Sequence, residues 1–120
     1  MKIQLQGQSL RLRIGEDELA QLLAGEAVAN ETRAPGAVLG HFVRVVEGEA
    51  PTFAVGQDGW HIGLPDAALR GYVARLPCRD ALELALGQGD EALAVSFEVD
   101  VRDSVRRRGP PQRRREPKAG

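Results

Sequence analysis

The two histidines are the first candidates for chemistry, because imidazole is the side chain whose ordinary pKa lies nearest neutral pH. His61 lies between two apolar residues, so in a strand it points away from the core, within reach of Asp58 or Asp66. His41 lies in an apolar run and is expected to face the interior. At the mouth of a barrel, either imidazole would be the acid–base group of an enzyme. A surface imidazole beside a carboxylate, and a buried histidine with satisfied hydrogen bonds, are the commoner structural explanations.

Nucleophilic and metal chemistry have little support among the residue types. Gly7-Gln8-Ser9-Leu10-Arg11 begins like the nucleophile elbow of a hydrolase, but it lacks the second glycine and precedes a strand instead of a helix. The chain has one Cys and two His, with no closely spaced pair of ligands, so no metal and no cofactor are predicted. Cys78, which follows Pro77, is expected to pack as a small apolar group.

Positive charge offers two candidate binding surfaces. Arg11 and Arg13 alternate with apolar residues, so they lie on the outer face of a strand, as a small anion-binding strip or an ordinary solvated face. The stronger signal is the end of the chain, where residues 106–120 carry a formal charge of +6 against −7 for residues 1–105. Six arginines of this tail are candidates for contact with a nucleic-acid backbone: Arg106, Arg107, Arg108, Arg113, Arg114 and Arg115.

Two features weigh against nucleic-acid binding. Residues 1–105 are acidic and would repel a polyanion, and most aromatic side chains fall on core-facing positions, which leaves no platform for stacking bases. Any contact through the tail is therefore expected to be independent of sequence. Two adjacent prolines and almost no apolar side chains predict that residues 105–120 form a disordered Arg/Pro-rich tail.

The elements that must position these residues begin with a hairpin and a helix. Residues 2–6 and 9–14 alternate apolar and polar side chains about a Gly-Gln turn, which predicts two paired strands. Leucines then recur at helical spacing over 16–23, with acidic residues in the first turn and Glu18 placed to reach back to the helix start. The pattern returns about fifty residues later, over 51–75. We interpret it as a structural duplication; two unrelated units that share a period are the alternative.

The remaining segments complete a repeated ββαββ order. A weak strand is expected at 27–33, a central and largely buried strand at 37–46, and alternating strands at 80–86 and 91–101. The predicted fold class is α+β: a mostly antiparallel, barrel-like sheet of seven or eight strands with two short helices.

One globular domain is expected at 1–104, with pseudo-repeat halves 1–50 and 51–104. The sequence contains no run of apolar residues long enough to span a membrane and no signal peptide. Its single cysteine suits a reducing compartment. We therefore expect a cytoplasmic location and no membrane partner.

The opening run, residues 1–14 followed by Glu-Asp-Glu-Leu, resembles the start of a family of small bacterial proteins. Members of that family open with a sequence like Met-Lys-Ile-Arg-Ile-x-Gly-Asn-Ser-Leu-Arg. Residues 59–65 and 98–101 also resemble the family's middle and final strands, and the likeness covers about residues 1–103.

This sequence departs from the family pattern at three places. Gln8 replaces the usual Asn of the turn, Gly15 replaces the usual helix cap, and Asp103-Ser104 lacks the cysteine that often follows the last strand. The family has no assigned activity, so the resemblance implies a fold and leaves the function open.

Several classes of function therefore stay open. A small non-catalytic cytosolic module that binds a protein partner or a small ligand is favoured. The alternatives are an enzyme with a barrel-mouth site that uses His41 or His61, and sequence-independent nucleic-acid contact through the tail. A polar interior cavity would favour the enzyme, whereas an interior filled by Leu and Val would favour the module.

Overall fold

The computed structural model describes residues 1–101, which form eight strands, two α-helices and one 3₁₀ turn. The predicted segments are therefore all present, and α+β is the correct fold class. In chain order the elements are β1 (Lys2–Gln6), β2 (Ser9–Ile14), α1 (Glu16–Leu23), β3 (Val28–Ala34), β4 (Ala37–Val46), β5 (Thr52–Gly56), β6 (Gly59–Pro65), α2 (Asp66–Ala74), β7 (Leu82–Leu86), η1 (Gly89–Glu91) and β8 (Leu93–Val99).

The strands form two separate four-stranded sheets. Sheet A has the order β1-β2-β8-β7 and sheet B the order β3-β4-β6-β5. Each sheet consists of two antiparallel hairpins joined by a parallel central pair, β2 with β8 and β4 with β6. Both sheets are thus mixed and end in edge strands, so the predicted barrel-like closure is not confirmed.

The element order ββαββ occurs twice along the chain. The hairpin and helix expected over 51–75 are confirmed as β5, β6 and α2, and they begin at residues 52, 59 and 66, against 2, 9 and 16 in the first half. Each sheet combines the first hairpin of one half with the second hairpin of the other. The two halves therefore interlock, and neither half forms a sheet of its own.

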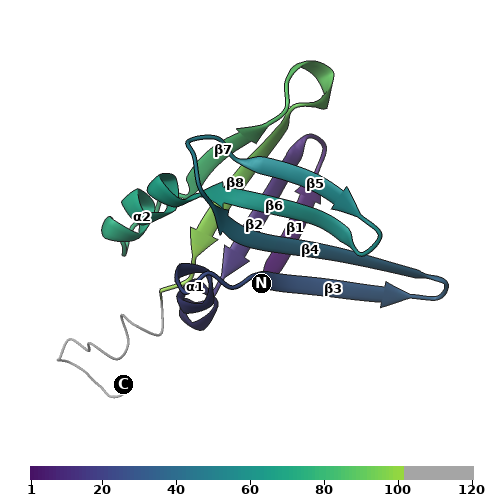
Figure 1. Ribbon diagram of the computed structural model, residues 1–120, viewed down its shortest axis with the longest axis horizontal. Helices are drawn as coiled ribbons and strands as arrows, with labels where there is room; N and C mark the ends of the chain where they lie inside the picture. Colours follow the sequence, from purple (N-terminus) through teal and green to yellow (C-terminus); the bar gives the residue numbers. More distant parts are fainter. Residues whose placement is uncertain (102–120) are drawn as a thin grey trace.

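The core lies between the two sheets, whose strands cross one another in Figure 1. Leu12, Val95 and Phe97, which alternation predicts to share a core, are all fully or almost fully buried there. Sheet B contributes Val43, Ile62 and Leu64, and both helices add leucines. Branched aliphatic side chains therefore make up most of the interior, together with the rings of Phe97 and Tyr72.

Helix α2 is fixed to β8 by a buried tyrosine. The hydroxyl oxygen of Tyr72 accepts a hydrogen bond of 3.2 Å from the backbone N–H of Val99, and its ring packs edge-on against Phe97. Burial raises the pKa of the Tyr72 hydroxyl, although the Val99 N–H opposes this shift. Tyr72 thus satisfies a backbone donor at the end of the last strand.

Helix α1 begins as the sequence predicts. The backbone N–H of Gly15 donates to Glu18 Oε1 at 3.1 Å, and the Met1 ammonium donates to Glu18 Oε2 at 2.7 Å. Burial alone would raise the pKa of Glu18, but these two hydrogen bonds and the positive charge of the Met1 ammonium together outweigh it and hold that pKa below its ordinary value. The carboxylate therefore caps the first turn.

The hairpin of β3 and β4 differs from its prediction, because β4 is buried only in its middle. Val38 and Leu39 are 46% and 45% exposed, and burial begins at Gly40. Figure 1 shows the reason: the hairpin end projects past sheet A, on the right of the view. Within residues 1–101, neither helix is long and apolar enough to cross a membrane.

Candidate functional site beside strand β5

His41 faces the interior, as predicted, but its hydrogen bonds are not satisfied. Its side chain is 4% exposed, and neither ring nitrogen has a hydrogen-bond partner within residues 1–101. The ring meets Trp60 edge-on with 5.6 Å between centroids, and its register partner in β3 is Asn30. Burial lowers the pKa of His41 and so favours its neutral form. An imidazole enclosed in this way has no route to a substrate from the core side.

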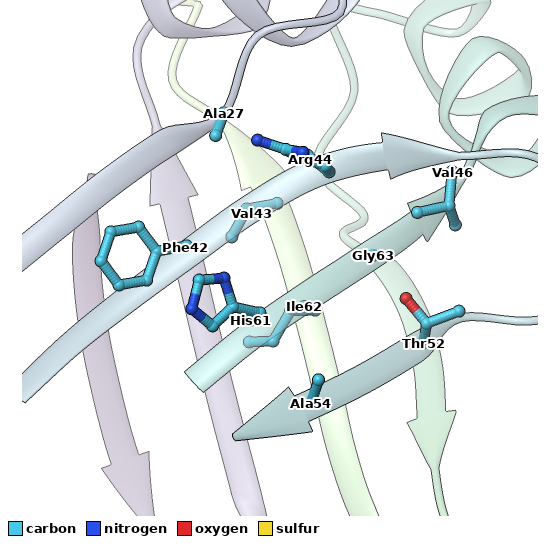
Figure 2. Close-up of a pocket in the computed structure, with 10 residues that line it drawn as sticks. All are labelled: Ala27, Phe42, Val43, Arg44, Val46, Thr52, Ala54, His61, Ile62 and Gly63. Atoms are coloured by element: carbon cyan, nitrogen blue, oxygen red, sulfur yellow. The ribbon is translucent and has the colours of Figure 1, made fainter. Parts of the chain in front are cut away.

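His61 lies on the outer face of sheet B, in a shallow hollow of about 430 Å³. Its Nε2 is 2.8 Å from Asp58 Oδ1, which confirms the predicted carboxylate partner and lowers the pKa of Asp58 through that hydrogen bond. The ring stacks on Phe42 with 4.6 Å between centroids, and Figure 2 shows the Arg44 side chain directed toward Ala27 in this view. Phe42 is thus an exception to the prediction that most aromatic side chains fall on core-facing positions. The hollow therefore holds an imidazole that is paired with Asp58 and stacked on Phe42.

Arg11 and Arg13 lie on the outer face of sheet A, as expected. They share this face with carboxylates: Arg13 is 3.8 Å from Asp100 and lies opposite Glu98 in the register of β8. Arg11 lies opposite Ser96. This mixture of charges is typical of a solvated face and gives little support to an anion-binding strip.

The remaining sequence candidates add no chemistry to the described part of the chain. Cys78 is half-buried against the core, with its Sγ 3.4 Å from the carbonyl oxygen of Asp80. Within residues 1–101, no three His, Cys, Asp or Glu side chains are placed to hold a metal ion. The six tail arginines lie outside the described residues, and so does the whole of the predicted disordered tail, residues 105–120.

A mainly apolar cavity of about 630 Å³ lies beside β5 and is larger than the hollow at His61. It lies where the β1–β2 turn and the β7–β8 connection of sheet A project past β5, the edge strand of sheet B (Figure 1). We call it the β5 step and define it by six apolar residues, five that line the cavity and one on the adjoining edge. They are Leu5, Phe53, Trp60, Leu86 and Leu93, together with Val55.

Three side chains of the β5 step point inward but are left exposed. Leu5 is 48%, Phe53 41% and Val55 69% exposed, although all three lie on the inner faces of their sheets. Sheet B ends at β5, so within residues 1–101 no strand covers the projecting ends of sheet A. An exposed apolar cluster of this kind is typical of an interaction surface.

The walls of the β5 step are held in place by aromatic packing and one side-chain hydrogen bond. Phe53 contacts Trp60 edge-on at 5.3 Å between centroids. Gln8 Nε2 donates to the carbonyl oxygen of Ala92 at 3.1 Å, which ties the β1–β2 turn to the β7–β8 connection. Glu91 is the charged residue among the lining groups. The arrangement suits the binding of apolar groups and contains no acid–base pair.

The β5 step cannot be recognised from the sequence pattern, for a physical reason. Alternation correctly places Phe53 and Trp60 on the inner face, but it carries no information about how far the opposite sheet extends. The sequence does contain one signal, since Thr-Phe-Ala-Val-Gly in β5 has no charged residue. Edge strands usually carry charged side chains, which prevent them from pairing with strands of other chains.

Comparison with known proteins leaves the interpretation to the geometry. No family model matches the chain, and nothing among the curated proteins or the solved structures matches it. The resemblance of residues 1–14 to the small bacterial family therefore stays a prediction.

Proposed function

We propose that this chain is a small non-catalytic module that binds a protein partner through the β5 step. The observation that carries the proposal is the coincidence of an apolar cavity with an unpaired strand edge. The cavity of about 630 Å³ adjoins Phe53 and Val55, which are exposed on the edge strand of sheet B. Peptide-binding surfaces combine these two features.

A protein partner fits this surface better than a small ligand does. A small molecule in the cavity could cover Trp60, Leu86 and Leu93, but Val55 lies outside the cavity lining and would stay 69% exposed. The backbone groups along the outer edge of β5, which pair with no strand of residues 1–101, would also stay uncovered. A polypeptide can cover the apolar residues and the edge together.

Three observations support a binding module over an enzyme. The interior is filled by Leu, Val and Ile side chains, His41 is enclosed, and His61 lies on the outer face of sheet B, away from the β5 step. A single cysteine, Cys78, suits the cytoplasmic location that we propose with this function.

Selection from a random library of linear peptides displayed on phage tests the proposal. The parent chain is the bait, and Val55→Lys is the blocking variant, because it adds a charge to the exposed edge without disturbing the core. Val38→Lys is the matched control: Val38 is 46% exposed on the projecting end of β4, away from the cavity lining, and receives the same substitution.

We expect peptides to be enriched on the parent and on Val38→Lys, and to lose binding to Val55→Lys by about tenfold or more. Their binding should also change the fluorescence of Trp60, the one tryptophan of the chain and a wall of the cavity. Enrichment that Val55→Lys leaves intact, or no enrichment on the parent, contradicts the proposal.

A further inference from the structure

We infer that the partner binds as an extended segment, which adds to β5 as a fifth strand of sheet B and carries Lys or Arg beside its apolar residues. This inference rests on the proposed function and specifies the form and the charge of the partner.

The edge of β5 differs from the other free edges. All five of its residues are exposed, and its sequence is uncharged. Of the four edge strands within residues 1–101, the others carry charged side chains: Lys2 in β1, Glu31 and Arg33 in β3, and Glu83 in β7. Charges on an edge strand oppose the addition of another strand. Strand addition is therefore least opposed at β5.

The position of the cavity favours a strand over other shapes. A strand placed beside β5 would lie over the projecting ends of sheet A, where Leu86 and Leu93 line the cavity. Successive side chains of a strand point to opposite faces, so every second residue of the added strand would enter the β5 step next to Phe53 and Val55. The segment should therefore carry apolar residues at alternate positions.

The negative charge around β5 indicates that the partner segment carries basic residues, and it disfavours a second copy of this chain as the partner. Residues 1–101 hold eight Lys and Arg against fifteen Asp and Glu, a formal charge of −7. Glu49 precedes β5, Asp58 follows it in the turn, and Glu91 lines the cavity. In an antiparallel pair of β5 strands centred on Ala54, Asp58 of one copy would face Ala50 of the other, next to Glu49. Like charges so placed repel, whereas Lys or Arg in a partner would be attracted.

The chain's own basic tail lacks the required apolar pattern. Residues 106–120 contain adjacent prolines and a single apolar side chain other than proline, Ala119. They provide the charge but not the alternating apolar residues that the cavity would accept. A separate partner therefore fits the β5 step better than the tail.

Peptides selected on the parent chain test the form of binding. We expect them to share apolar residues at alternate positions with Lys or Arg nearby. A synthetic copy of the most enriched peptide is then N-methylated at alternate backbone nitrogens, in two complementary sets. One set blocks the pairing with β5 and should weaken affinity about tenfold or more, and the other set should leave affinity within about twofold. Replacement of the basic residues by Gln should weaken binding most at low salt.

The outcomes separate this inference from the proposed function. In one outcome, Val55→Lys blocks the peptides, but they tolerate both N-methylated sets or carry apolar residues at helical spacing. This result rules out strand addition and leaves the proposed binding function standing. In another outcome, the parent chain dimerises in sedimentation, and the dimer is abolished by Val55→Lys but kept by Val38→Lys. The occupant of the β5 step is then a second copy of this chain. A synthetic peptide of residues 106–120 that displaces the selected peptides at high salt assigns the site to the tail. Each of these results overturns the inference.

Discussion

Replacement of His41 by leucine should stabilise the protein, which is the opposite of the usual effect of a core substitution. His41 is 4% exposed, and neither ring nitrogen has a hydrogen-bond partner within residues 1–101. A buried polar group without a partner costs about 1–3 kcal/mol. Leucine has a similar volume and needs no partner. We therefore expect His41→Leu to raise the free energy of unfolding at neutral pH by an amount in that range.

The same substitution should also remove part of the pH dependence of stability. Burial lowers the pKa of His41 in the folded protein, whereas in the unfolded chain the imidazole titrates near its ordinary value of about 6.5. As the pH falls through that value, the unfolded state binds a proton before the folded state does. The folded protein is thus destabilised on the acid side, by at most about 1.4 kcal/mol between roughly pH 7.5 and 5.5.

Urea denaturation of both proteins at several pH values measures the two effects. The chain has two histidines, so His61→Gln is the matched control: it removes the exposed imidazole and should keep the acid-side loss that His41 causes. His41→Met provides a second apolar side chain of different shape, so that overpacking by leucine alone can be recognised. Our account of His41 is wrong if both apolar variants are less stable than the parent. It is also wrong if the free energy of unfolding of these variants changes with pH in the same way as that of the parent.

Three further predictions concern the core and the tail. Phe97→Ala should lower the free energy of unfolding in urea by about 3–5 kcal/mol, because the ring is fully buried between the sheets; a loss below about 1 kcal/mol contradicts this. Tyr72→Phe leaves the Val99 N–H without its acceptor and should cost about 1–3 kcal/mol in the same assay, whereas no loss would mean that the hydrogen bond is dispensable. Truncation after Val105 should leave the melting temperature unchanged, because it keeps every described core residue through Val101, and should abolish any salt-sensitive retention of RNA; an unfolded truncated chain would contradict it.

The elements of the fold were predictable because each is encoded by local pattern. Alternation identified β1, β2, β7 and β8, and leucines at helical spacing identified α1. Periodicity assigns side chains to a face but does not say which strands pair. The parallel contacts β2–β8 and β4–β6 join segments far apart in the chain, so the division into two open sheets was beyond local reasoning.

Features of the candidate sites that depend on neighbouring residues in the chain were predictable, whereas features that depend on distant segments were not. The Asp58 partner of His61 was predictable, because the two residues are three apart in one hairpin. The unsatisfied nitrogens of His41 were not, since they depend on what β3, β6 and sheet A place around the ring. The β5 step depends on where one sheet ends relative to the other, and no local pattern records that length.

The repeated order also explains why only one of two equivalent edges is proposed to bind a strand. β1 and β5 hold the same place in their halves and in their sheets, each as the edge strand of a hairpin followed by a helix. On their outer faces, however, β1 carries Lys2 and Gln4, where β5 carries Thr52 and Ala54. A lysine on an edge disfavours pairing with another strand, and alanine does not. The same backbone design thus leaves β1 protected and β5 open, with the apolar cavity beside the open edge.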